Sequence, residues 1–150
     1  MDLGSEYESE CERMKIVNKF SFFLPIRIPT KTHQEKRVTV VNGKPKFYED
    51  AELKDVRSKY ESHLAKYAPQ QPMKHAVELH VVWCFPKGQH ENGEPKITKP
   101  DTDNMIKLFK DCMTKTGFWK DDAQVFREIN EKFYSKVEGV FVQATEYAKE

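Results

Sequence analysis

The sequence predicts an α+β fold with two layers, a sheet and two main helices packed on it. Three apolar segments have the length and the β-branched and aromatic content of strands, at residues 16–26, 75–86 and 139–147. Two other segments, 49–68 and 103–117, repeat apolar side chains every three or four residues, which is the period of an amphipathic helix. Because the chain has 150 residues and no internal repeat, one domain with one core is expected.

The first half of the chain predicts a strand, a hairpin and a helix, in that order. Residues 16–26 end at prolines, which is typical of a strand that runs out into a loop. Residues 37–48 alternate apolar and polar side chains on both sides of Asn42-Gly43, a dipeptide that tolerates the positive φ of a tight hairpin turn. The first main helix follows at 49–68, where two prolines stand just beyond the last apolar position.

The second half predicts a central strand, a loop, the second helix and two more strands. Residues 75–86 are almost continuously apolar, as in a strand that is covered on at least one face. Residues 87–99 are basic with Ile97 as the one aliphatic side chain, and we expect a mobile surface loop there. The second helix begins near Asp103 and ends near Gly117, since glycine commonly stands just past a helix. The last two strands are expected at 124–136 and 139–147.

Charge divides the chain into an acidic tail and a basic body. Residues 1–13 contain five acids and one arginine, a net charge of −4. Since the whole chain has a net charge of +1, residues 14–150 carry +5. We expect residues 1–13 to be a disordered tail, and residues 14–150 to be one domain that can bind an anionic partner.

Composition also predicts a cytoplasmic protein. No apolar run approaches the roughly 20 residues of a membrane-spanning helix, and the acidic N-terminus differs from a basic signal peptide. The three cysteines lie far apart with no Cys-x-x-Cys pair, so reduced thiols are expected, with Cys84 and Cys112 in the core.

Two carboxylates stand close together in KPDTDN, at the start of the second predicted helix. Because Pro100 keeps the preceding backbone extended, Asp101 and Asp103 lie two residues apart and point the same way. One interpretation is an ordinary N-cap, which satisfies free backbone N–H groups. The other is half of a metal site, because two carboxylates on one face repel each other unless a cation lies between them, and oxygen ligands suit Mg²⁺ or Mn²⁺. Both interpretations stay open at this point.

A third acid for such a site is available in GFWKDDAQV. Gly117 allows the chain to reverse after the helix, so the following strand can return Asp122 to the side of Asp101. Lys107 lies one helical turn after Asp103, where it can pair with that acid or contact a phosphate. An EF-hand is excluded, because the segment lacks that motif's later acid and its glycine, and no glycine-rich phosphate loop or His-Glu-x-x-His motif occurs.

The stretch KPDTDNMIKLFKDCMTKTGFWKDDAQV resembles the signature of the RusA-type Holliday-junction resolvases. Both linked elements of that signature, Asp-x-Asp-Asn with a following lysine and Asp-Asp-x-Gln-Val, are present at the expected separation. The resemblance implies a RusA-like homodimer that uses Mg²⁺, or Mn²⁺ in its place, and no other small-molecule cofactor. It also implies the following roles: metal ligands Asp101, Asp103 and Asp122, an essential Lys107, an accessory acid Asp121, and Asn104 as a hydrogen-bonder that fixes a ligand carboxylate.

The activity expected from this resemblance is structure-selective cutting of four-way DNA junctions in recombination and repair. Metal-assisted hydrolysis of the phosphodiester bond would use the three acids, and surface lysines would contact phosphates. The lysines expected at the DNA are Lys31, Lys96 and Lys99. Where some family members carry an arginine-rich run before the first acid, this chain has GQHENGEPKITK, so its DNA contacts differ. The alternatives are a DNA-binding accessory protein without catalysis, and a nuclease for flap or RNA substrates.

Overall fold

A computed structural model of the chain describes residues 4–5, 13–29, 36–49 and 51–150. Most of the predicted tail, and Lys31, lie outside these described residues. The elements follow in the order β1 (Met14–Leu24), β2 (Lys36–Val41), β3 (Lys44–Glu49), α2 (Ala51–Leu64), β4 (Ala76–Pro86), α3 (Thr102–Thr116), the 3₁₀ turn η1 (Asp122–Gln124), β5 (Val125–Ser135) and β6 (Gly139–Lys149).

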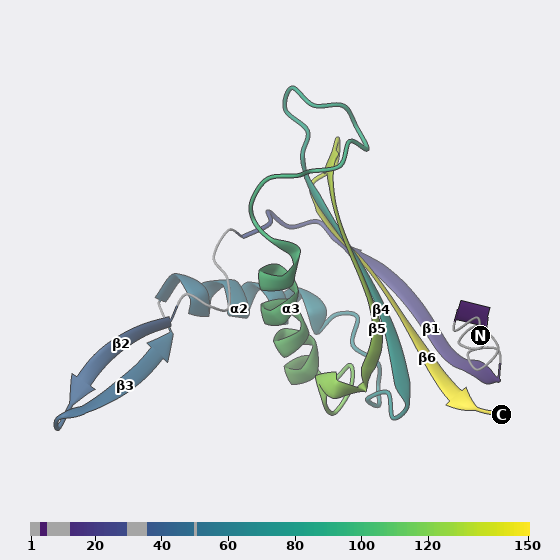
Figure 1. The fold of residues 1–150 in the computed structure, drawn as a ribbon, viewed down its shortest axis with the longest axis horizontal. Helices are drawn as coiled ribbons and strands as arrows, with labels where there is room; N and C mark the ends of the chain where they lie inside the picture. The colour runs from purple at the N-terminus through teal and green to yellow at the C-terminus, as the bar shows by residue number, and fades with distance from the viewer. Residues whose placement is uncertain (1–3, 6–12, 30–35, 50) are drawn as a thin grey trace.

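Four of the strands form one mixed sheet in the order β1-β6-β4-β5. The strand β6 pairs antiparallel with both β1 and β4, whereas β4 and β5 are parallel. A parallel pair needs a crossover connection, and α3 supplies it between β4 and β5. The hairpin of β2 and β3 is a separate two-stranded sheet that projects from the body (Figure 1).

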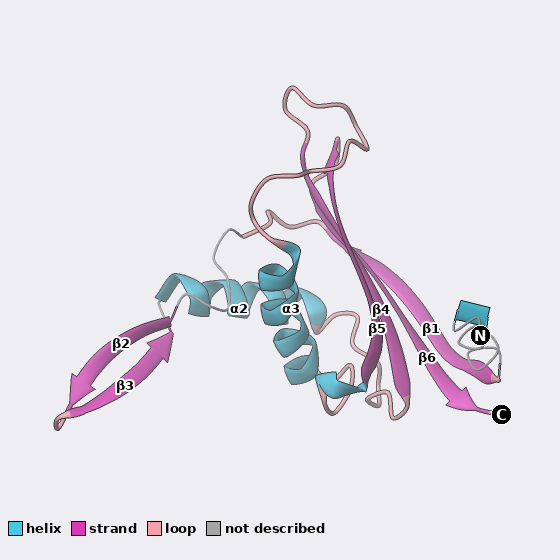
Figure 2. Cartoon of the chain, viewed as in Figure 1, coloured by secondary structure: helices cyan, strands magenta, loops and turns pink. Residues whose placement is uncertain are grey.

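The two helices lie on the same face of the four-stranded sheet, which gives the predicted two layers (Figure 2). Alternate residues of β4 are fully buried on that face, and the aromatic side chains of the two layers meet there. The ring of Phe109 from α3 lies edge-on to Tyr60 of α2 and to Trp83 of β4, at centroid distances of 5.1 and 5.3 Å. These two ring contacts hold α3 against α2 and the sheet, and so fix the positions of both ends of the helix.

The predicted elements are confirmed to within a few residues at their ends. Asn42 and Gly43 both have positive φ in the β2–β3 turn, at 53° and 76°. The end of α3 is also as expected, because Gly117 adopts the left-handed conformation and its N–H donates to the carbonyls of Met113 and Thr114. Cys112 is buried, and burial raises the pKa of its thiol to about 12. Among the described residues, no helix is long and apolar enough to span a bilayer.

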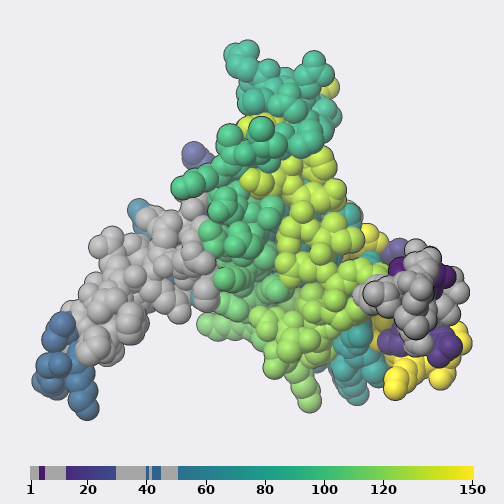
Figure 3. Space-filling model, in the orientation of Figure 1, coloured from purple at the N-terminus to yellow at the C-terminus, as the bar shows by residue number. Residues whose placement is uncertain are grey.

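The segment after β4 forms the projecting end of the molecule, next to the start of α3 (Figure 3). Backbone hydrogen bonds hold it to β5, and its mobility stays a prediction. The N–H of Gly93 donates to the carbonyl of Tyr134, the N–H of Tyr134 donates to Glu94, and the N–H of Lys96 donates to Lys132. The ring of His90 also stacks on Tyr134 at 3.8 Å between centroids. These contacts give the basic loop a fixed path toward Asp101.

Candidate active site

The first candidate acid, Asp101, is the N-cap residue of α3 by its backbone. Its φ of −76° and ψ of 142° are extended, and its carbonyl accepts the first helical hydrogen bond from the N–H of Met105. Its carboxylate, however, makes no capping hydrogen bond and is exposed. The capping interpretation therefore explains the backbone of Asp101 and leaves its side chain unexplained.

Asp103 and Asn104 lie in the first turn of the helix, close to Asp101 along the chain. Asp103 is exposed, and within the described part of the chain no cationic side chain pairs with it. The side-chain oxygen of Asn104 is buried without a hydrogen-bond partner among these residues. A buried acceptor without a donor is costly, so this oxygen is suited to a donor or a cation that binds from outside the chain.

Lys107 lies one turn further along α3 and is exposed. Its ammonium forms no ion pair with any carboxylate that the structure describes, Asp103 included. The next lysine, Lys110, contrasts with it, because it pairs with Glu128 of β5 at 2.7 Å. Of the two roles expected for Lys107, the ion pair with Asp103 is absent, and the contact with a phosphate stays a prediction.

At the other end of α3, Asp121 and Gln124 build the turn that carries Asp122. The carboxylate of Asp121 accepts a hydrogen bond from the N–H of Ala123 at 2.9 Å, as the N-cap of η1. The side-chain oxygen of Gln124 accepts from the N–H groups of Lys120 and Asp121, and its amide nitrogen donates to the carbonyls of Met73 and His75. All four of these hydrogen bonds are made to backbone groups of the turn and of the segment before β4, so they fix the backbone around Asp122.

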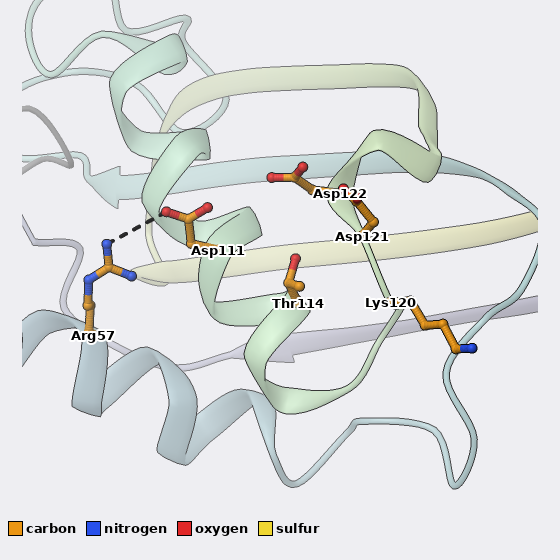
Figure 4. Close-up of a pocket in the computed structure, with 6 residues that line it drawn as sticks. All are labelled: Arg57, Asp111, Thr114, Lys120, Asp121 and Asp122. Carbon is orange, nitrogen blue, oxygen red and sulfur yellow. Dashed lines mark ion pairs between the residues drawn. The ribbon is translucent and has the colours of Figure 1, made fainter.

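Asp122 borders a polar cavity of about 300 Å³ at the C-terminal half of α3. The cavity is lined by Arg57, Asp111, Thr114, Lys120, Asp121 and Asp122. Asp122 points across the cavity toward Asp111, whereas Lys120 points away from the carboxylates (Figure 4). Arg57 of α2 pairs with Asp111 at 3.6 Å. This arrangement gives Asp122 polar neighbours from α3 and α2, and none of them was expected from the sequence.

The two groups of candidate acids therefore lie apart along α3. Asp122 lies beside Asp111 and Thr114, which are 8 to 13 residues beyond Asp103 and Asp101, or roughly 12–20 Å along the helix axis at 1.5 Å per residue. Among the described residues, no group of three His, Cys, Asp or Glu side chains is placed to hold a metal ion. The expectation that the chain returns Asp122 to the side of Asp101 is therefore wrong within one chain, because the reversal occurs only after the full length of the helix.

The residue that does return to the start of α3 is Lys132 of β5, which the sequence analysis missed. Its ammonium donates to the carbonyls of Thr98 at 2.6 Å and Pro100 at 2.9 Å. Strand geometry gives a signal that could have found it. At about 3.3 Å per residue, a strand beginning at Val125 covers the length of α3 in roughly seven residues.

The lysines expected at DNA have different surroundings. Lys99 is exposed, directly before the Pro100 that precedes Asp101. The ammonium of Lys96 is turned inward, where it donates to the hydroxyl of Thr98 at 2.7 Å and lies 5.1 Å from the ring centroids of Phe85 and Tyr134. Lys99 is therefore the better placed of the two for a contact outside the chain.

Comparison with known proteins agrees with this fold and these motifs. Residues 27–145 match the family of RusA endodeoxyribonucleases. A relative from Lactococcus phage r1t, named as the crossover junction endodeoxyribonuclease RusA, is 31% identical over 111 residues, which cover 71% of this chain and 82% of the relative. The chain belongs to the RusA family of endodeoxyribonucleases.

Proposed function

We propose that this chain is a metal-dependent endonuclease that cuts four-way DNA junctions, acting in recombination and repair. The family membership and the name of the phage relative support the nuclease class and the branched substrate. The observation that carries the assignment lies at the entry to α3. There, the exposed Asp101 makes no capping bond, Asp103 stands two residues away, and the buried oxygen of Asn104 has no donor among the described residues.

These groups fit a hard divalent cation, because carboxylate and amide oxygens are its preferred ligands and no cationic side chain that the structure describes pairs with Asp101 or Asp103. In the proposal, Asp101 and Asp103 hold Mg²⁺, or Mn²⁺ in its place, with Asn104 hydrogen-bonded beside them. When bound, such an ion supplies activation of a water molecule and neutralises charge on the scissile phosphate. Lys107 stabilises the same developing charge from one helical turn away.

Asp122 completes this site in the proposal by coming from a second copy of the chain. Its position beside the C-terminal half of α3 separates it by roughly 12–20 Å along the helix axis from the other two acids of its own chain. In the proposed two-fold dimer, the two α3 helices run antiparallel and meet through their solvent-facing sides. Each Asp122 then lies beside Asp101 and Asp103 of the other copy. The resulting homodimer has two sites, which suits paired nicking of two opposed strands.

The test is cleavage of a synthetic four-way junction by wild-type protein, Asp101→Asn and a control, Asp55→Asn. Asp55 is an exposed acid on α2, so its variant changes the same charge away from the site. We expect Mg²⁺-dependent cleavage by wild type and by Asp55→Asn. Asp101→Asn should bind the junction as wild type does and lose at least about a hundredfold of the cleavage rate, since a metal ligand is lost.

Several outcomes would contradict the proposal. Wild-type protein that binds junctions without cutting them in Mg²⁺ or Mn²⁺ would favour the accessory DNA-binding protein. Faster cutting of flap or RNA substrates than of junctions at the same salt concentration would favour the other alternative, and salt must be fixed because it changes phosphate affinity strongly. If Asp101→Asn fails to fold, its carboxylate has a structural role that the contacts do not predict.

A further inference from the structure

The side chain of Lys132 is the strongest unassigned feature next to the proposed site. It projects from the helix-facing side of β5 and is half-buried. Its ammonium binds two backbone carbonyls, those of Thr98 and Pro100, at 2.6 and 2.9 Å. These distances are typical of charge-assisted hydrogen bonds, which are about twice as strong as neutral ones. The second carbonyl belongs to the residue directly before Asp101.

This contact bridges a gap in the backbone hydrogen bonds of the loop. Backbone bonds hold the loop to β5 as far as the N–H of Lys96, and the helical bonds of α3 begin at the carbonyl of Asp101. Between them, in residues 97–100, no backbone–backbone hydrogen bond is present within the described part of the chain. The ammonium of Lys132 ties this segment to the sheet at Thr98 and at Pro100, whereas the side chain of Lys96 holds only the hydroxyl of Thr98.

We propose that Lys132 is a positioning residue for the metal site, acting through the backbone of residues 98–100. By fixing the carbonyl of Pro100, it sets the direction in which the chain enters α3 and so the orientation of the Asp101 carboxylate relative to Asp103. The inference rests on the proposed function, because it assigns Lys132 to the same site. A direct contact of Lys132 with DNA is not favoured, since the side chain is half-buried and two of its three N–H donors are already used inside the chain.

The test compares Lys132→Met, Lys132→Arg and Lys110→Met with wild type. Methionine keeps most of the apolar stem and removes the ammonium, and arginine restores a charged donor. Lys110 is the matched control, because it is also half-buried and its pairing with Glu128 at 2.7 Å does not involve the loop. Three quantities are measured: hydrogen exchange of the peptide covering residues 97–105 without metal, Mn²⁺ binding by calorimetry, and the Mg²⁺ concentration for half-maximal junction cleavage.

We expect Lys132→Met to exchange faster in residues 97–105, to bind Mn²⁺ about tenfold more weakly and to need about tenfold more Mg²⁺ for cleavage, as for other residues that orient metal ligands. Lys132→Arg should recover most of each change, and Lys110→Met should match wild type in all three. Junction binding without metal should be unchanged in every variant.

Two results would overturn the inference. One is unchanged exchange in residues 97–105, and the other is a cleavage loss at every Mg²⁺ concentration with the half-maximal concentration unmoved. If Lys132→Met does not fold, Lys132→Gln gives the same three measurements and decides in the same way. Exchange and Mn²⁺ binding do not depend on the substrate, so absence of junction cleavage by wild type would contradict the proposed function and leave the test of Lys132 valid.

Discussion

At the entry to α3, the backbone and the side chain of Asp101 have separate roles. The backbone has the extended dihedral angles of an N-cap, while the carboxylate makes no capping bond and stays exposed. Because no ion pair holds this carboxylate within the described residues, it is available for an external ion.

Replacement of Lys107 by alanine tests its proposed contact with the transition state. The control is Lys115→Ala, since Lys115 is exposed on the same helix and pairs only weakly, at 3.5 Å, with Glu61. We expect Lys107→Ala to bind junctions and Mn²⁺ as wild type does and to cut about a hundredfold to a thousandfold more slowly, as when one charge-stabilising donor is lost. Single-turnover rates measure this, and a wild-type rate would remove Lys107 from the mechanism.

Replacement of Gln124 by alanine tests the turn that carries Asp122. Four hydrogen bonds of its amide are lost, and two backbone N–H groups and two carbonyls lose their partner. The free energy of unfolding should fall by about 2–3 kcal/mol, less than four independent bonds because water replaces some of them. Urea unfolding measures it. The exposed Gln70→Ala should change by less than about 0.5 kcal/mol, and an equally small effect of Gln124→Ala would contradict the role.

At the scale of elements, Glu146 of β6 connects the last strand to the segment before β4. Its carboxylate accepts hydrogen bonds from the N–H groups of Lys74 and His75, at 2.8 and 3.0 Å, and from the ring Nδ1 of His75. Burial alone would raise the pKa of Glu146, but these hydrogen bonds outweigh it and lower the pKa below the ordinary value of 4.5. These hydrogen bonds favour the ionised carboxylate, so they weaken when the pH falls low enough to protonate Glu146.

The stability of the protein should therefore fall as pH falls through the lowered pKa of Glu146. The sign follows from linkage: the contribution of a carboxylate with a lowered folded pKa is present above its unfolded pKa and is lost below the folded one. Glu146→Gln should lose about 1–3 kcal/mol at neutral pH and show a flatter stability profile from about pH 6 to pH 3. Thermal unfolding across this range measures both, and a profile parallel to that of wild type would contradict the assignment.

The elements could be predicted from the sequence because each one has a clear period. The continuous apolar run of β4, the three-to-four spacing in α3 and the turn at Asn42-Gly43 are local signals, and the structure agrees with all of them. The position of Asp122 relative to Asp101 is not local, since it depends on where the chain reverses. Gly117 marks that reversal at the far end of the helix, and the returning chain brings Asp122 back only as far as Asp111 and Thr114.

The contacts made by Lys132 and by Asp111 could not be found from motifs. Lys132 depends on the parallel pairing of β4 with β5, which places it opposite Trp83 and beside the loop. Asp111 depends on how α2 crosses α3, because its partner is Arg57 of α2. Such contacts depend on how two elements pack against each other. The apolar periodicity of a single element does not predict that packing.

At the scale of the whole molecule, the proposed site requires two chains, and mixing two inactive variants tests this directly. In a mixed dimer of Asp103→Asn and Asp122→Asn chains, one site contains both changes and the other contains neither. Purified mixed dimers should therefore have about half of the wild-type number of intact sites, with nicking of one strand only.

The measurement is junction nicking by two separately tagged, co-purified chains. Each variant alone should be inactive, which is the control. If the tags show that mixed dimers form and nicking does not return, the three acids do not share a site across the dimer. A mixture of Asp101→Asn with Asp103→Asn should stay inactive in either case, because both acids come from the same end of one helix.

The length of α3 has a consequence for the spacing of the two cuts. In the proposed dimer, the two complete sites are separated along one antiparallel helix pair, so α3 sets a spacing of roughly 12–20 Å between them along its axis. That span is comparable to the width of a DNA duplex. The length of α3 would therefore determine how far apart the two cut phosphates of the junction lie. A relative whose helix is longer by two turns would reach phosphates about 10 Å further apart.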